Sequence, residues 1–549
     1  MAERKASELF VECLEAEGVT HVFGIPGEET LDLNESLEDS SIAFVPVRHE
    51  QGAAYMADMF GRLSRGAGVC LGTLGPGATN LITGVADAFL DRSPLVALTG
   101  QADLERMHKE SHQHIDIVSM FKPVTKWNVR LNSSRVIPEV VRKAFKVAQA
   151  QKPGPTHIEL PEDVMAEPVD AQPLPAQLRV RRPEPSGDEL LEATSLIRAA
   201  EHPIVLAGNG VARVGAAAAL REFARATGIG VAETFMGKGL LDFRDPRALG
   251  TVGLQSRDYA LAGFEDADVV ITVGYDLVEH APKNWNPGRD KQIVYVDTVA
   301  AEVDEHFMTA VDLVGDLDQI LSHLALELRD GGGDAATCSR LNDIVLGRFE
   351  SGRDDEHFPV QPPRALWEIR AALGPQDMLI SDVGLHKLWI ARMFPAHEPE
   401  TVFIANGLAG MGIALPTAIA AKLVHPERKV VTVSGDGGFL MNVQELETAV
   451  RLGTPIVNVI WENRQFGSIV WKQDKKFGRH FGTDFANPDF VALAGAFGMP
   501  AWRIGAVGDF GPTLRRALGL DVASLIVLPI DYSLDVAISE ELGTETVAA

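Results

Sequence analysis

The chain is predicted to be an α/β protein with three doubly wound domains, each built on a parallel sheet. Short apolar stretches alternate with segments of helical spacing along almost all of its 549 residues. The stretches are nearly continuous runs of apolar residues, which is typical of strands buried on both faces. The 51 glycines provide tight turns between these elements. With 46% hydrophobic and 23% charged residues, the chain can form sizeable cores and is not a disordered protein.

The first domain is predicted over residues 1–168. Ser7–Glu17 has the spacing of an amphipathic helix, and Gln51–Arg62 is a second helical segment. The predicted strands are His21–Gly27 with its terminal turn, Ile42–Val47, Gly68–Thr73, Leu95–Thr99 and Thr156–Leu160.

The second domain is predicted over residues 187–330. It follows a polar linker at 169–186, which four prolines punctuate. Its expected strands are Pro203–Ala207, Val269–Val273 and Ile293–Val296. A second polar connection from Gly331 to Asp355 is expected to be helical around 341–349.

The third domain is predicted over residues 360–549. It resembles the first domain in size and alternation but shows no residue-level repeat, so any duplication is one of structure at most. Its expected strands are Met378–Ser381, Val430–Ser434, Ile456–Ile460 and Ser524–Pro529.

The net charge and the cysteines exclude several classes of protein. A net charge of −26 repels phosphate backbones and anionic lipid, so we expect no nucleic-acid or membrane-surface binding. No apolar run reaches the roughly 18–20 residues of a membrane span. Three scattered cysteines form neither a disulfide framework nor a CxxC metal pattern, and no apolar signal core follows Met1. These features predict a cytoplasmic protein.

The strongest local motif lies between Val430 and Asn463. A strand leads into Gly435-Asp436-Gly437-Gly438, a helix follows, and a second strand ends at Asn463. Both polar residues therefore lie at the carboxyl edge of a sheet, where open α/β folds bind ligands. A carboxylate and an amide oxygen suit Mg²⁺, and the glycines let the backbone approach a diphosphate. The alternative is an ordinary glycine-rich turn with a surface aspartate.

This pattern resembles the thiamine-diphosphate motif, and the whole chain resembles the acetolactate synthases of the pyruvate-oxidase-like group. The resemblance implies the thiamine-diphosphate-binding fold, thiamine diphosphate and Mg²⁺ as cofactors, and a homodimer or homotetramer with active sites between subunits. The segments that carry it are Gly24–Gly27, Arg48–Gln51, Gly75–Gly77, Pro123–Lys126, Glu159–Val164 and Ala414–Pro416.

The resemblance assigns roles at the diphosphate end of the cofactor. The expected metal ligands are Asp436, Asn463 and the carbonyl of Gln465. The family's paired asparagines appear here as Glu462-Asn463, a partial departure. The residues expected at the diphosphate are Gly384, His386, Gly435, Gly437 and Gly438.

Glu50 is the expected catalytic glutamate, which bonds the aminopyrimidine ring and helps to generate the carbanion at the thiazolium carbon. The alternative is that Glu50 only caps the helix that follows it.

The resemblance also assigns residues around the rings and the substrate. Gln113 is expected to face the substrate and to donate to a carboxylate or a developing alkoxide. The Gly75 turn either seats a cofactor or is a tight structural turn. Met411 is expected under the bent cofactor, with a core methionine as the alternative, and the backbone of Ala409 and Gly410 is expected near the aminopyrimidine.

The middle domain distinguishes branches of the family. Where the biosynthetic enzymes hold FAD, residues 273–280 read VGYDLVEH, which resembles the FAD-independent catabolic enzymes, so we expect no FAD. Lys472 stands where the biosynthetic enzymes carry a tryptophan that favours 2-oxobutyrate, so pyruvate is the expected acceptor.

The predicted function is therefore condensation of two pyruvates to 2-acetolactate with loss of CO₂. Glu28-Glu29 stands where the catabolic enzymes usually have a lysine, which keeps open a 2-oxo acid decarboxylase or another carboligase. A catalytically silent binding protein of the same fold is disfavoured, because such proteins tend to lose the glutamate or a metal ligand. This chain keeps Glu50, Asp436 and Asn463. A Rossmann dehydrogenase is disfavoured, because the chain has no GxGxxG motif at the end of a predicted strand. Gly208-Asn209-Gly210 is too short a match.

Overall fold

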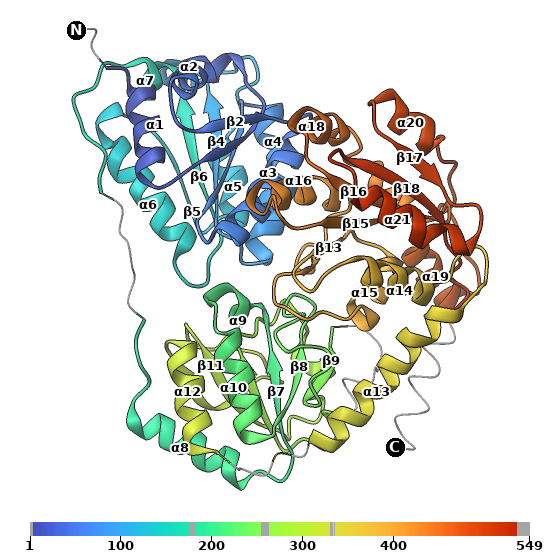
Figure 1. The fold of residues 1–549 in the computed structure, drawn as a ribbon. Helices are drawn as coiled ribbons and strands as arrows, with labels where there is room; N and C mark the ends of the chain where they lie inside the picture. Colours follow the sequence, from blue (N-terminus) through green and yellow to red (C-terminus); the bar gives the residue numbers. More distant parts are fainter. Residues whose placement is uncertain (1–3, 176–181, 254–262, 330–332, 334, 535–549) are drawn as a thin grey trace.

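A computed structural model describes residues 4–175, 182–253, 263–329, 333 and 335–534 (Figure 1). The strands of these residues form three six-stranded sheets, and every pairing between named strands is parallel. The predicted α/β fold with three parallel sheets is confirmed. The strands come from residues 21–161, 203–314 and 378–529. The domain limits 1–168, 187–330 and 360–549 stay a prediction.

The N-terminal sheet forms every strand that the sequence predicts for it. In spatial order its strands are β2 (Ala43–Pro46), β1 (His21–Gly24), β3 (Gly68–Gly72), β4 (Leu95–Gln101), β6 (Pro155–Pro161) and β5 (Trp127–Arg130). The unpredicted strand is β5, a half-buried edge strand without a continuous apolar run. The helices are α1 (Ala6–Ala16), α2 (Leu31–Glu38), α3 (Glu50–Ser64), α4 (Pro76–Leu90), α5 (Ile117–Phe121), α6 (Ile137–Gln149) and α7 (Glu162–Ala166).

The C-terminal sheet repeats the strand order of the N-terminal sheet, so the two domains share one topology. Its strands are β14 (Val402–Ile404), β13 (Met378–Ser381), β15 (Val430–Gly435), β16 (Ile456–Glu462), β18 (Ser524–Pro529) and β17 (Ala501–Arg503). The unpredicted strands β14 and β17 have only three residues each and lie at the edges. The helices are α14 (Pro362–Ala372), α15 (Leu385–Met393), α16 (Ala414–Val424), α17 (Asp436–Phe439), α18 (Glu445–Leu452), α19 (Gly467–Phe477), α20 (Phe490–Ala496) and α21 (Phe510–Leu518).

The central sheet has a different strand order. Its strands are β12 (Thr309–Val314), β11 (Gln292–Asp297), β10 (Val269–Val273), β7 (Pro203–Ala207), β8 (Gly230–Glu233) and β9 (Ala248–Thr251). The described helices include α8 (Gly187–Ala199), α9 (Asn209–Val214), α10 (Ala217–Thr227) and α12 (Leu317–Glu327). The linker predicted at 169–186 is described at 169–175 and 182–186, which form no helix or strand, and its middle lies outside the described residues.

The second polar connection is more ordered than the sequence predicts. Helix α13 runs over Ala335–Ser351, well beyond the helix expected around 341–349. Its Leu341 and Phe349 are buried, and it packs against β9 of the central sheet and against α14 and α15. The connection therefore joins two domains by packing, while Gly331 and Gly332 lie outside the described residues.

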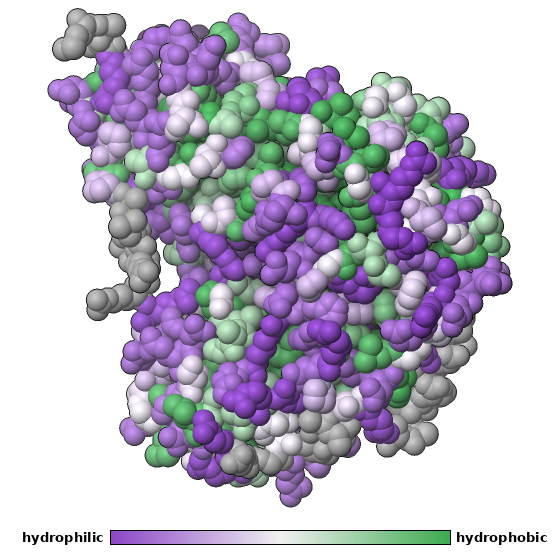
Figure 2. All heavy atoms as spheres, in the orientation of Figure 1, coloured by the Kyte–Doolittle hydropathy of each residue, from purple (hydrophilic) through white to green (hydrophobic). Residues whose placement is uncertain are grey.

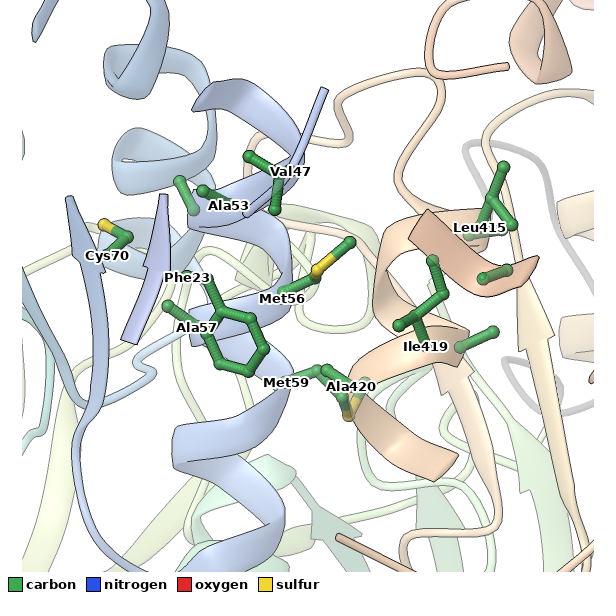
Figure 3. Close-up of a cluster of buried hydrophobic side chains, with 14 of the residues drawn as sticks. Phe23, Val47, Ala53, Met56, Ala57, Met59, Cys70, Leu415, Ile419 and Ala420 are labelled. Carbon is green, nitrogen blue, oxygen red and sulfur yellow. The ribbon is translucent and has the colours of Figure 1, made fainter. Parts of the chain in front are cut away.

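The N-terminal and C-terminal domains share one hydrophobic core. Helices α3 and α16 lie side by side between the two sheets (Figure 1). Met56 and Met59 of α3 face Ile419 and Ala420 of α16 (Figure 3). Residues 414–422 of α16 are all buried, because the helix lies between the C-terminal sheet and α3. This packing fixes the position of the two strand-end edges described below.

Candidate functional site

Four adjacent strands of the N-terminal sheet end at one edge, and the segments after them carry the predicted residues. Glu29 follows β1, Glu50 follows β2, Gly75 follows β3 and Gln113 lies in the loop after β4. A Cβ at Gly75 would lie 3.0 Å from the Cβ of Gln113, and one at Gly77 would lie 3.4 Å from Oε1 of Glu50. The fold thus brings Glu50, Gly75 and Gln113 together at the carboxyl edge of the sheet.

Glu50 is buried, with 7% of its surface exposed, and it is the first residue of α3. The helix is capped by the ring of His49, which accepts the N–H of Gln51 at 3.1 Å. The Glu50 carboxylate instead accepts a hydrogen bond from Nδ2 of Asn80 at 2.9 Å. The cap of this helix is therefore His49, and the Glu50 side chain does not serve as its cap. Asn80 contacts Glu50 but was not among the residues predicted from the sequence.

The Glu28-Glu29 departure lies at this same edge. Glu29 accepts a hydrogen bond from Oγ1 of Thr73 at 2.8 Å, so it is tied to the strand end beside Gly75. Glu28 is exposed. Gln113 is exposed on a loop with a φ of +55°.

The C-terminal sheet has a second edge of the same kind. Four adjacent strands, β14, β13, β15 and β16, end there. The predicted residues follow them in turn: Ala409, Gly410 and Met411 after β14, Gly384 and His386 after β13, Asp436 to Gly438 after β15, and Asn463 and Gln465 after β16.

The buried carboxylate of Asp436 lies at the centre of this edge. Its Oδ2 accepts the backbone N–H groups of Asn463 at 3.1 Å and Arg464 at 2.6 Å. The same oxygen accepts Nδ2 of Asn487 at 2.9 Å, whereas Oδ1 accepts only the N–H of Gly437, at 2.9 Å. Oδ1 therefore keeps capacity for a cation. Asn487, which the sequence analysis missed, contacts Asp436, and its own Oδ1 is buried without a hydrogen-bond partner.

Glu462, the residue that departs from the family's pattern, is neutralised by Arg503. Two guanidinium nitrogens of Arg503 bond its carboxylate at 2.6 and 2.9 Å. Burial opposes ionisation here, but the hydrogen bonds and charge of Arg503, together with Asn487 and Arg464, outweigh it and lower the pKa of Glu462. Gln465 and Asp484 form an isolated antiparallel β-bridge. Its hydrogen bonds run to the carbonyls of Arg464 and Thr483, so the bridge does not use the carbonyl of Gln465.

His386 lies in a cradle of glycines next to Asp436. Its Nε2 is buried without a hydrogen-bond partner, and burial lowers the pKa of His386 to about 4, so the ring is neutral at pH 7. A Cβ at Gly384 would lie 2.7 Å from the His386 ring, and one at Gly435 would lie 3.4 Å from it. One at Gly437 would lie 2.8 Å from the Phe466 ring. Bare backbone and a carboxylate are groups that suit a magnesium diphosphate, and the bare Nε2 of His386 can take up a proton beside a phosphate oxygen.

The loop of Ala409, Gly410 and Met411 is held by buried carboxylates. Asp91 accepts the N–H of Gly407 at 2.7 Å, and Asp382 accepts that of Gly412 at 2.9 Å. These bonds fix a loop in which Ala409 has a φ of +57°. Met411 is half-buried and lies outside the hydrophobic clusters of the described residues, so it is not a core methionine.

Three family models match the chain, and together they match more than half of it. The N-terminal TPP binding domain of thiamine pyrophosphate enzymes matches residues 4–120, the central domain of these enzymes matches 190–324, and their C-terminal TPP binding domain matches 382–528.

Full-length relatives give the same result. The chain is 35% identical to an acetolactate synthase of Bacillus subtilis, over 97% of this chain and 94% of the relative. It is 36% identical to the catabolic acetolactate synthase of Raoultella terrigena, over 96% and 95%. It is 32% identical to the large subunit of acetolactate synthase isozyme 2 of Escherichia coli, over 95% and 94%.

Proposed function

The chain belongs to the acetolactate synthase family of thiamine pyrophosphate enzymes, and we propose that it condenses two pyruvate molecules to 2-acetolactate with loss of CO₂. The observation that carries the proposal is the pair of strand-end edges. One edge presents Glu50 and Gln113, and the other gathers Asp436 and His386 with their glycines. This division is what a cofactor with a ring end and a diphosphate end requires.

The residues present fit thiamine diphosphate and Mg²⁺. Asp436 with its free Oδ1 position, Asn463 and the carbonyl of Gln465 would hold Mg²⁺, whose preferred ligands are oxygens. The negative diphosphate would favour protonation of the unpartnered Nε2 of His386, which would then donate to a phosphate oxygen. The backbone of Gly384, Gly435, Gly437 and Gly438 would approach it closely. When bound, thiamine diphosphate supplies the electron sink that lets a 2-oxo acid lose CO₂.

The chain's own residues would orient the reactants and move one proton. Glu50 would hold a proton at the aminopyrimidine ring, and Asn80 keeps its carboxylate in place. Gln113 would donate to the substrate carboxylate. Met411 would support the rings from the loop that Asp91 and Asp382 hold. The acceptor we propose is pyruvate, with Lys472 exposed on α19.

Flavin is not part of the proposal, because the central domain uses its own groups at the strand ends. The N–H of Asn209 donates to both carboxylate oxygens of Glu279, at 3.2 and 3.1 Å. Gly208 and Gly210 pack directly on Gly274, so side chains do not fit there. Because the Glu279 carboxylate already occupies the N–H of Asn209, that N–H is not available to a nucleotide phosphate, which supports a central domain without flavin.

We propose a homodimer or homotetramer in which the two edges of different subunits meet. Large apolar side chains are exposed beside both edges: Ile115 and Met120 near the first, and Leu408 and Met441 near the second. Hydrophobic residues also gather where the N-terminal and C-terminal domains meet (Figure 2). Exposed apolar patches of this kind mark protein contacts. The three cysteines are free and buried, which supports a cytoplasmic location. Among the described residues, every helix is too short or too polar to span a membrane.

The test is incubation of the protein with pyruvate, thiamine diphosphate and Mg²⁺, followed by measurement of acetolactate against acetaldehyde. A carboligase forms acetolactate, whereas a decarboxylase on the same scaffold releases acetaldehyde.

A further inference from the structure

The side chain of Glu445 belongs to the C-terminal domain but lies at the start of α3 in the N-terminal domain. Glu445 is the first residue of α18 and is completely buried. Its Oε1 accepts the backbone N–H groups of Arg48 at 3.1 Å and His49 at 3.0 Å. Its Oε2 accepts Oγ1 of Thr448 at 2.6 Å. The carboxylate therefore holds the backbone N–H groups of the two residues directly before Glu50.

Physical chemistry explains why a carboxylate occupies this position. The N–H groups at the start of a helix have no partner within the helix, and the helix dipole favours negative charge there. A buried carboxylate, in turn, needs several donors to offset its lost hydration. Burial raises the pKa of Glu445, and the hydrogen bonds from Thr448 and the two peptide groups oppose that rise. Each partner thus depends on the other.

Gly52 makes room for this contact. A Cβ at Gly52 would lie 2.8 Å from Oε1 of Glu445 and 3.0 Å from its Cδ. A methyl group there would push the carboxylate away from Arg48 and His49. The first turn of α3 is therefore shaped around the Glu445 side chain.

The chain segment that leads from Asp436 to Glu445 contacts other residues expected at the cofactor. Within it, Nδ2 of Asn442 donates to the carbonyl of Gly412 at 2.9 Å. The N–H of Glu445 then donates to the carbonyl of Asn442 at 3.0 Å. Residues 436–445 thus link the expected metal site, the end of the Met411 loop and the backbone before Glu50.

We propose that Glu445 is a positioning residue, which sets the place of the Glu50 carboxylate by binding the peptide groups of Arg48 and His49. The inference rests on the proposed function, since it needs Glu50 to act on the aminopyrimidine. Glu445 itself touches neither substrate nor cofactor.

The test uses hydrogen–deuterium exchange at the thiazolium C2 of thiamine diphosphate bound to the whole enzyme, followed by NMR without pyruvate. In E445Q, the side chain loses the negative charge that the start of α3 favours, and only one acceptor oxygen remains for Arg48, His49 and Thr448. We expect exchange about 10- to 100-fold slower than in the wild type, as small displacements of catalytic groups produce, with unchanged affinity for the cofactor by calorimetry. E447Q, at a half-exposed position of α18 where Glu447 pairs with Arg451 and does not touch Arg48 or His49, is the matched control and should exchange like the wild type.

The second perturbation comes from the other side of the contact. G52A should slow exchange as E445Q does, and the double variant should be no slower than the slower single variant, because both remove one interaction. T448V, which keeps the carboxylate but removes its support, should give a smaller loss. Wild-type exchange in both E445Q and G52A, or slowing that multiplies in the double variant, overturns the inference. If the wild type exchanges the proton but forms no acetolactate, the proposed function fails while this comparison still decides the role of Glu445.

Discussion

The carboxylate of Asp436 accepts the backbone N–H of Asn463 at 3.1 Å, although the two residues are 27 positions apart in the chain. The contact follows from register, because β15 and β16 pair in parallel and Gly435 lies opposite Trp461. The residues after these two partners emerge together at the carboxyl edge of the sheet. One crossover thus brings two oxygen-bearing side chains to one place, where Mg²⁺ would need them.

Replacement of Asp436 should abolish cofactor binding. D436N keeps the shape of the side chain but places a donor among the N–H groups of Asn463, Arg464 and Asn487. We expect Mg²⁺-dependent affinity for thiamine diphosphate to fall by at least ~100-fold, since a metal ligand is lost. Isothermal calorimetry with and without Mg²⁺ measures this. D521A, at an exposed position, is the control, and wild-type affinity in D436N would disprove the assignment.

Replacement of Glu50 should separate binding from turnover. E50Q keeps a hydrogen-bonding side chain beside Asn80 but cannot hold the transferable proton. We expect cofactor affinity close to that of the wild type and a turnover reduced by about 10²- to 10⁴-fold, the usual contribution of general acid–base catalysis. Steady-state kinetics with saturating cofactor provide the measurement. Near-normal turnover would refute the catalytic role.

A methyl group at Gly410 should disturb the Met411 loop, because its Cβ would lie 2.2 Å from Oη of Tyr55. We expect G410A to lower the free energy of unfolding by about 1–3 kcal/mol, as overpacking does, and to weaken cofactor binding. Removal of the clashing hydroxyl in Y55F/G410A should restore part of both. Urea denaturation and calorimetry follow the two quantities. A double variant less stable than G410A would contradict the packing argument.

His157 should make the protein sensitive to acid. It is completely buried, and burial lowers its pKa to about 3. Below the ordinary histidine pKa of about 6.5 the unfolded chain binds a proton that the native chain does not, so this residue destabilises the fold by about 1.4 kcal/mol per pH unit.

The variant H157Q removes that titration. Its free energy of unfolding should therefore fall less steeply than that of the wild type between pH 6.5 and 5, whatever its value at pH 7. Urea denaturation at several pH values gives the two slopes. Equal slopes would show that His157 titrates normally in the native state.

The central domain should contain no flavin. The N–H of Asn209 is already bonded to the carboxylate of Glu279, and burial raises the pKa of Glu279 to about 7. We expect no flavin absorption bands in the purified protein and no gain in activity on addition of FAD. Release of flavin on heat denaturation would contradict this prediction.

Local sequence patterns predicted the parts of the site that strand ends determine. Asp436 and Asn463 each follow an apolar strand, and adjacent parallel strands must end together, so their meeting could be predicted. The short edge strands β14 and β17 could not be predicted, because three residues are too few to show a periodic pattern.

The supporting residues have no local signal at all. Asp91 holds Gly407 across 316 positions of the chain, and Glu445 holds Arg48 across 397. These contacts arise only when α3, α4 and α16 pack between two sheets. Asn487 likewise reaches Asp436 from the segment before α20. Tertiary packing, which no local pattern encodes, decides all three.

The central claim is that the two strand-end edges together make a carboligase for pyruvate. Its most direct test is to incubate the purified protein with pyruvate, thiamine diphosphate and Mg²⁺ and to measure both acetolactate and acetaldehyde. We predict acetolactate as the main product, formed only when Mg²⁺ is present and largely lost in E50Q. Acetaldehyde as the main product, with no acetolactate from the wild-type protein, would contradict the account.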